Sequence, residues 1–123
     1  MKTKRQETGR RGEELARGFL KKRGFSIVET NYRCPQGEID IVCRDGEYLV
    51  FVEVRTKTSR EFGSPEESIT QSKKKRMLAA AYHYWQAHGD PLEPWRIDLV
   101  AIELDKEGKI SRIELIENAL GES

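Results

Sequence analysis

Two apolar runs joined by a short polar turn dominate the hydrophobic pattern of the chain. Residues 37–43 and 48–55 are rich in β-branched and aromatic residues, and the turn between them, residues 44–47, contains Asp-Gly. Such a turn between such runs predicts an antiparallel β-hairpin. Because side chains alternate along a strand, Glu53 and Arg55 are predicted to share one face of the second run.

Apolar positions at helical spacing predict a helix on either side of this hairpin in the sequence. The first spans about 8–23, with Gly12 near the centre of its apolar face, and the second runs from Ser64-Pro65 to residue 87 or 88. Elsewhere the pattern predicts strands at 25–29, 95–103 and 109–116, loops at 30–37 and 56–62, a mobile arm at 1–7 and a polar tail at 117–123. This order predicts one α/β domain over residues 1–123, a sandwich with a mixed central sheet flanked by helices.

Composition agrees with one small domain and excludes several classes of protein. Charged residues make up 35% and apolar residues 37% of the 123, so most of the charge must be solvated around a compact core. No apolar run is long enough to cross a bilayer and no secretory signal pattern is present, so we expect a cytoplasmic protein without membrane contacts. Cys34 and Cys43 are too few for a disulfide framework and are expected as free thiols.

The net charge of +1 conceals an uneven distribution. Residues 1–24 hold nine Lys and Arg against three Glu, whereas residues 86–123 hold four basic against nine acidic residues. A basic N-terminal helix can face nucleic-acid phosphates, although charge runs of this kind are more often ordinary solvated surface.

Two acidic residues interrupt the apolar runs of the hairpin. Asp40 lies in the first run and Glu53 in the second, where an ionised carboxylate costs several kcal/mol to bury unless it is paired or binds a cation. One interpretation is a site for Mg²⁺ or Mn²⁺, which prefer carboxylate oxygens. The other is a buried ion pair between Glu53 and Arg55, with Asp40 in water at the strand edge. These residues alone leave both interpretations open.

Two helical residues are predicted to face the sheet. Glu13 falls at the edge of the apolar stripe of the first helix, and Lys73 lies in the middle of the stripe of the second. Both also have ordinary structural explanations, because an acid near a helix start favours the helix dipole and a Lys can extend along a surface to water.

The acidic residues stand in an order known from nucleases. Asp40 lies thirteen residues before Glu53 of Glu53-Val54-Arg55, which resembles the PD-(D/E)xK motif of restriction-endonuclease-like enzymes. The chain more closely resembles the YraN-like family of bacterial proteins and, more distantly, archaeal Holliday-junction resolvases. The segments that carry the family resemblance are Gly12-Glu13, Asn31-Tyr32-Arg33, Gly37-Glu38-Ile39-Asp40, Phe51-Val52-Glu53-Val54-Arg55, Gly63-Ser64-Pro65, Lys73 and Arg96-Ile97-Asp98.

This resemblance implies the restriction-endonuclease-like fold and a metal-dependent nuclease that hydrolyses phosphodiester bonds. It further implies that Asp40, Glu53 and the backbone carbonyl of Val54 bind Mg²⁺ or Mn²⁺. Because the resembling resolvases carry a Glu on the first helix, the resemblance also implies that Glu13 completes the acidic shell.

One position departs from the motif, because Arg55 stands where a Lys is usual. Arginine stays protonated at any working pH, so Arg55 can stabilise negative charge but cannot act as a general base. Lys73 and Lys57 are the candidates for the missing amine.

The expected partner is nucleic acid, DNA rather than RNA, in the form of branched, recombination or repair intermediates. The candidate phosphate contacts are Arg10, Arg11, Lys57 and Arg60. Two alternatives remain open: a nucleic-acid-binding module that kept the fold without turnover, and a structural charge network without metal. Asp98 is either a partner of the acidic residues or a charge at the wet end of its strand, and a homodimer is also left open.

Overall fold

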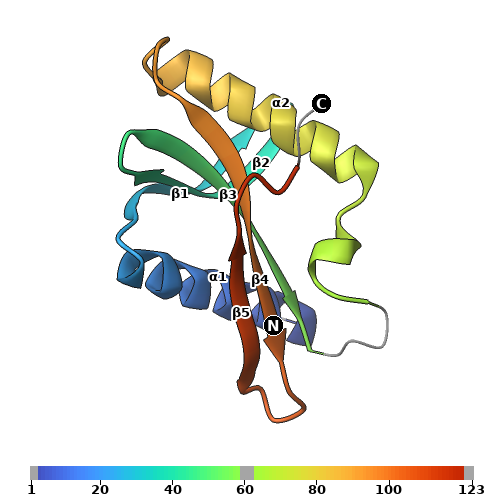
Figure 1. Ribbon diagram of the computed structural model, residues 1–123. Helices are drawn as coiled ribbons and strands as arrows, with labels where there is room; N and C mark the ends of the chain where they lie inside the picture. Colours follow the sequence, from blue (N-terminus) through green and yellow to red (C-terminus); the bar gives the residue numbers. More distant parts are fainter. Residues whose placement is uncertain (1–2, 59–62, 121–123) are drawn as a thin grey trace.

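Five strands form one sheet with a helix on each face in the computed structural model, which describes residues 3–58 and 63–120 (Figure 1). In chain order the elements are α1 (Lys4–Lys22), β1 (Ser26–Cys34), β2 (Gly37–Asp45), β3 (Tyr48–Lys57), the 3-10 helix η1 (Glu66–Ser68), α2 (Gln71–His88), β4 (Trp95–Leu104) and β5 (Ile110–Ile116). Helix α1 covers one face of the sheet and α2 the other, so the α/β sandwich that the sequence predicts is confirmed (Figure 1).

The strands lie side by side in chain order, from β1 to β5. Only β3 and β4 run parallel, and the other neighbours are antiparallel, which makes the sheet mixed as predicted. A parallel pair requires a crossover connection, and the segment that contains η1 and α2 provides it. The predicted hairpin is β2–β3, in which Asp45 pairs with Tyr48 beside the turn.

Two apolar layers hold the helices against the sheet. The layer on the α1 side includes Ala16, Leu20, Val50, Val52, Val100 and Ile102. The layer on the α2 side includes Leu49, Phe51, Met77, Ala80 and Tyr84. Alternation along β3 therefore places Glu53 on the α2 side, beside Phe51 and Met77, as the period of two predicts.

Helix α1 begins earlier than predicted. Thr3 and Gln6 form a reciprocal cap, in which Gln6 N–H donates to the Thr3 hydroxyl (3.1 Å) and Thr3 N–H donates to Gln6 Oε1 (3.0 Å). This cap satisfies free N–H groups of the first turn. The prediction of a mobile arm at 1–7 is therefore wrong from Lys4 onward, and residues 1–2 lie outside the described part.

Strands β1 and β3 are longer than predicted. β1 continues through residues 30–34, which were expected in a loop, because it pairs with β2 as far as Cys34 opposite Gly37. β3 includes Thr56 and Lys57, which pair with β4 instead of opening the expected loop. In both cases hydrogen bonds to a neighbouring strand outweigh the local sequence preference.

The ends of the crossover helix and of the described chain also differ from prediction. Helix α2 begins at Gln71 rather than near Ser64, because η1 precedes it and the Thr70 hydroxyl caps it. Residues 117–120, expected as part of a polar tail, form a turn from which Leu120 packs against the α2-side layer. Residues 121–123 lie outside the described part.

Gly12 brings α1 close to β3. A Cβ atom placed on Gly12 would lie 1.9 Å from Oγ1 of Thr56 and 3.1 Å from its Cβ, so no side chain fits at this crossing. The close packing that the position of Gly12 suggested is thus observed, and it fixes the N-terminal half of α1 over the end of β3.

Replacing Gly12 by Ala is expected to destabilise the protein by about 1–3 kcal/mol, because the methyl group forces α1 away from Thr56. Gly18→Ala on the same helix is the control, since nothing lies within 4 Å of the added Cβ and Ala favours a helix interior by about 0.5–1 kcal/mol. Urea unfolding of both variants measures the difference. Equal effects of the two substitutions would contradict the close contact.

Arg112 of β5 ties the start of the crossover to the far edge of the sheet. Its guanidinium donates to both carboxylate oxygens of Glu66 in η1 (2.9 and 2.7 Å) and to Glu103 of β4 (2.8 Å). The hydrogen bonds from Arg112 lower the pKa of Glu66 from 4.5 to about 2.

This depressed pKa predicts a pH-dependent contribution to stability. The stabilisation by Glu66 is fully present above pH 4.5 and is lost as the pH falls toward 2, because the unfolded chain binds the proton more readily. Since the carboxylate is partly exposed, we expect Glu66→Gln to cost only about 1 kcal/mol at neutral pH. Thermal unfolding should show this deficit shrinking below about pH 4.5, whereas a constant deficit would rule out the charged hydrogen bonds as its source.

Candidate metal and nuclease site

The pairing of β2 with β3 ends where Asp40 begins to interact with β3. Backbone pairing runs from Asp45 and Tyr48 to Ile41 and Val52. Beyond that point, the N–H of Val54 donates to Oδ2 of Asp40 at 2.8 Å. A side-chain oxygen of Asp40 thus accepts the hydrogen bond from Val54 that a backbone carbonyl of β2 would accept in a continued strand pair.

In both β1 and β2, the alternation of side chains between the two faces of the sheet shifts at this point. Ile41 packs in the α1-side layer and Ile39 in the α2-side layer, although residues two apart in a regular strand share a face. In β1, Asn31 lies between the residues paired with Ile41 and Ile39 and has a left-handed backbone with φ of 55°. The pleat is therefore interrupted in two adjacent strands, at Asn31 and at Asp40.

Asp40 and Glu53 form a buried pair of carboxyl groups that influence each other's ionisation. Burial and the negative charge of Asp40 raise the pKa of Glu53 to about 8. Burial also raises the pKa of Asp40, against the opposing effect of the Val54 N–H. Only 4% of Glu53 is exposed, so its carboxyl group lies in a largely dry site.

Two cations lie beside this pair. The Nζ atom of Lys73, from α2, lies 3.5 Å from Oε2 of Glu53, and the Nε atom of Arg55 lies 3.8 Å from the same oxygen. The Nε atom of Arg55 is buried and has no hydrogen-bond partner among the described residues. Of the two candidate amines, the structure thus places Lys73 at Glu53, whereas Lys57 stands at the end of β3.

Glu13 approaches the pair only from the Asp40 side. It is half-buried on α1, where burial and the nearby Asp40 raise its pKa, and the Asn31 side chain opposes this rise. Within residues 3–58 and 63–120, no three His, Cys, Asp or Glu residues are grouped closely enough to hold a metal ion. Glu13, Asp40 and Glu53 therefore do not form one compact cluster.

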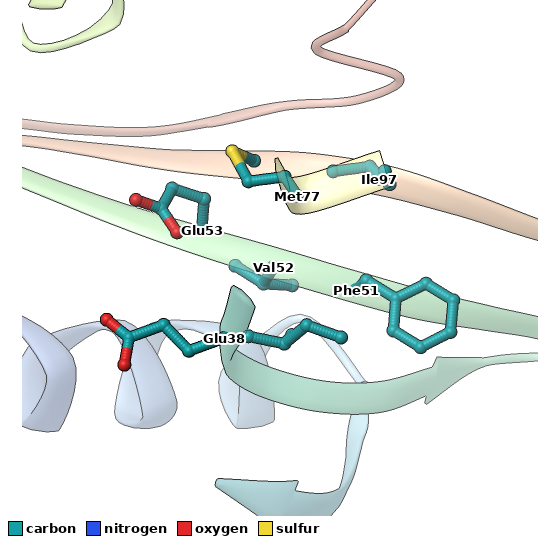
Figure 2. A pocket seen from close by; sticks show the side chains of 7 residues that line it. Glu38, Phe51, Val52, Glu53, Met77 and Ile97 are labelled. Carbon is teal, nitrogen blue, oxygen red and sulfur yellow. The ribbon is translucent and has the colours of Figure 1, made fainter. Parts of the chain in front are cut away.

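Two hollows adjoin the pair. A cavity of about 10 Å³, enough for roughly one water molecule, lies beside Glu53, Met77 and Glu38 (Figure 2). In Figure 2 the carboxylates of Glu38 and Glu53 point in the same direction, away from the apolar end of this cavity where Phe51 and Ile97 lie. A larger groove of about 310 Å³ shares Glu38 and Met77 with the cavity, and its other lining residues are Arg33, Cys34, Gly37, Lys73 and Arg76.

Comparison with known proteins places the chain in a family. The family model described as "Uncharacterised protein family UPF0102" matches residues 12–102. The chain belongs to the UPF0102 family. Similar curated members are UPF0102 proteins of Dehalococcoides mccartyi (52% identical over 96% of both chains), Pelotomaculum thermopropionicum (44% over 90% of this chain and 92% of the relative) and Renibacterium salmoninarum (47% over 88% and 91%). The YraN-like resemblance is thereby confirmed, while the relation to PD-(D/E)xK nucleases stays a prediction.

The phosphate contacts predicted for this UPF0102 chain lie apart from the two hollows. Arg10 pairs with the exposed Glu14 at 3.9 Å, and Arg11 donates to the carbonyl of Gly108 in the β4–β5 turn. Neither they nor Lys57 line the cavity or the groove. Arg60 lies outside the described residues.

Asp98 has a structural role on the opposite face of the sheet from Glu53. It is fully buried beside Val52 in the α1-side layer, accepts from Arg96 Nε at 3.0 and 3.1 Å, and accepts from the N–H of Asn118 at 3.0 Å. Neither alternative offered by the sequence was correct, because Asp98 is neither beside the acidic pair nor in water.

Two further expectations concern the cysteines and the membrane. Cys34 and Cys43 are free thiols, as expected, and Cys43 is buried. Neither helix in the described ranges is long and apolar enough to cross a bilayer.

Sequence reasoning missed Asn31, Arg33 and Arg76. Asn31 carried one usable signal, because Asn tolerates the left-handed backbone better than most residues. The sequence did not indicate that Arg33 and Arg76 line one groove, since this depends on how α2 lies against the β1–β2 hairpin.

Replacing Asn31 separates its backbone role from its side-chain role. Because a left-handed backbone costs an ordinary residue about 1–2 kcal/mol, Asn31→Ala is expected to lose about 1 kcal/mol of stability, whereas Asn31→Gly retains most of it. Both variants also lose the side-chain amide, which opposes the rise in the pKa of Glu13. Urea unfolding measures the difference, and an Asn31→Ala variant as stable as Asn31→Gly would show that the strained backbone is unimportant.

Proposed function

We propose that this UPF0102 protein is a metal-dependent nuclease that hydrolyses phosphodiester bonds in DNA, with branched or repair intermediates as its substrates. The observation that carries the proposal is the buried Asp40–Glu53 carboxyl pair at the point where β2 leaves β3. Buried carboxyls whose pKa values are shifted by burial and by each other are typical of functional sites. Lys73 and Arg55 beside the pair supply positive charge where a phosphate would approach.

The donor set fits a hard divalent cation. Asp40 and Glu53 bring two carboxyl groups to one buried place, and carboxylate oxygens are preferred ligands of Mg²⁺ and Mn²⁺. In a strand the N–H and C=O of one residue point to the same side, so the carbonyl of Val54 faces the side on which its N–H meets Asp40. Asp40, Glu53 and Val54 would hold the ion, and Glu13 approaches Asp40 from α1.

The residues around the pair have distinct roles in this proposal. A bound Mg²⁺ or Mn²⁺ would supply Lewis acidity toward water and phosphate. The hydrogen bond from Val54 fixes the orientation of Asp40. Arg55 and Lys73 would stabilise the charge that develops on the phosphate.

A nucleic-acid-binding module without turnover is the second candidate, and Arg55 favours it. Lys73 and Arg55 already lie beside Glu53, so the carboxyl pair has cationic partners without an added ion. Arginine in place of the usual lysine also removes a group that could activate water.

The decisive experiment combines cleavage with metal binding. Labelled four-way junction, flap, duplex and single-stranded DNA, with RNA alongside, are incubated with the parent protein, Asp40→Asn and Glu53→Gln, in Mn²⁺ and in chelator. We expect cleavage of at least one DNA structure that requires Mn²⁺ and both carboxylates. Binding without cleavage in every condition would favour the second candidate.

Asp40→Asn should abolish Mn²⁺ binding while preserving the fold, because the Asn side-chain oxygen can still accept from Val54. Mn²⁺ at about 100 times its Kd should stabilise the parent by about 2.7 kcal/mol, and should leave Asp40→Asn unchanged. Glu107→Gln, which removes an exposed carboxylate in the β4–β5 turn, is the control and should respond like the parent. An Asp40→Asn variant that binds Mn²⁺ as tightly as the parent would disprove the proposed site.

A further inference from the structure

The groove beside the acidic pair is built from two elements that are distant in the sequence. One wall is the β1–β2 turn region, with Arg33, Cys34 and Gly37, and the other is the first half of α2, with Lys73 and Arg76. Its volume of about 310 Å³ is that of a small ligand site. The two walls touch at Gly37, where an added Cβ would lie 3.1 Å from the carbonyl oxygen of Arg76.

Positive charge predominates in this groove. Three of its lining residues are cations, Arg33, Lys73 and Arg76, and one is an anion, Glu38. Arg33 lies 3.6 Å from Glu38, but 79% of its side chain is exposed, so it remains accessible to a ligand. Arg76 is also exposed. The ligand favoured by this arrangement is an anion that meets guanidinium groups on both walls.

The groove is linked to Glu53 through Lys73 and through the small cavity. Lys73 lines the groove and also lies 3.5 Å from Glu53, while Glu38 and Met77 line both the groove and the cavity beside Glu53. A chain of phosphates bound between Arg33 and Arg76 would therefore lead to the carboxyl pair past Lys73. Residues three apart on a helix are neighbours, so Lys73 and Arg76 present their charges along one line of α2.

We infer that this groove binds the sugar-phosphate backbone of one nucleic-acid strand next to the acidic pair, with Arg33 and Arg76 as phosphate contacts. The inference rests on the proposed function for its substrate class, and it assigns the binding surface to the hairpin and α2 rather than to Arg10, Arg11 and Lys57. Phosphate contacts of this kind position the strand without reading its sequence.

Binding measured in chelator tests the groove separately from catalysis. Fluorescence anisotropy with labelled single-stranded and duplex DNA is followed over a range of salt concentrations for the parent and for Arg33→Gln combined with Arg76→Gln. The double variant should bind at least about tenfold more weakly. The slope of log Kd against log salt concentration should be smaller by about one to two, because two phosphate contacts are lost. Both side chains are exposed, so the melting temperature should stay near that of the parent.

The matched control removes the same charge elsewhere. Lys106→Gln combined with Lys109→Gln alters two exposed lysines near the β4–β5 turn and should leave the affinity and the salt slope nearly unchanged. Equal losses in the control and groove variants would overturn the inference, and so would a parent that binds no nucleic acid. If the groove variant alone loses affinity while the parent cuts nothing, the groove stands and the nuclease proposal fails. If the groove variant binds and cuts like the parent, the nuclease stands and the groove fails.

Discussion

The hydrogen bond from the Val54 N–H to the Asp40 carboxylate is the interaction on which the rest of the site depends. It ends the β2–β3 ladder without leaving the Val54 N–H unpaired, because the side chain of Asp40 replaces a backbone acceptor. It also brings the side chain of Asp40 to β3, in which Glu53 directly precedes Val54. The register of the hairpin, in which Ile41 is opposite Val52, already directs Asp40 toward Glu53 on β3. The interruption of regular pairing adds the contact between the Asp40 carboxylate and the backbone of Val54.

Charges of both signs surround this bond, and their attraction offsets part of the cost of burying them. Two carboxyl groups lie beside two cations, Lys73 and Arg55, in surroundings where an unpaired charge would cost several kcal/mol. The raised pKa of Glu53 shows that burial and the charge of Asp40 still oppose its ionisation. The metal site that we propose would use the same residues as this charge network.

The sequence predicted those features that depend on periodicity within one element. The period of two put Glu53 and Arg55 on one face of β3, the helical period turned Lys73 toward the sheet, and Gly12 was recognised as a close crossing. It did not predict features that depend on contacts between elements. Residues 30–34 join β1 because β2 pairs with them, Asp98 is buried because Arg96 and the Asn118 backbone accompany it, and the groove exists because α2 meets the β1–β2 hairpin. Helix and strand periods describe which way side chains point, but they contain no information about which other element lies there.

The close contact at Gly37 links the acidic pair to the groove. Because Gly37 has no side chain, the carbonyl of Arg76 can lie against the start of β2, and this sets how near α2 comes to the hairpin. The same helix position places Lys73 at Glu53 and Arg76 in the wall of the groove. A larger residue at Gly37 would push α2 outward and would weaken both contacts together. The acidic pair and the basic groove are therefore not independent surfaces, because one helix carries Lys73, which lies at the pair, and Arg76, which lies in the groove.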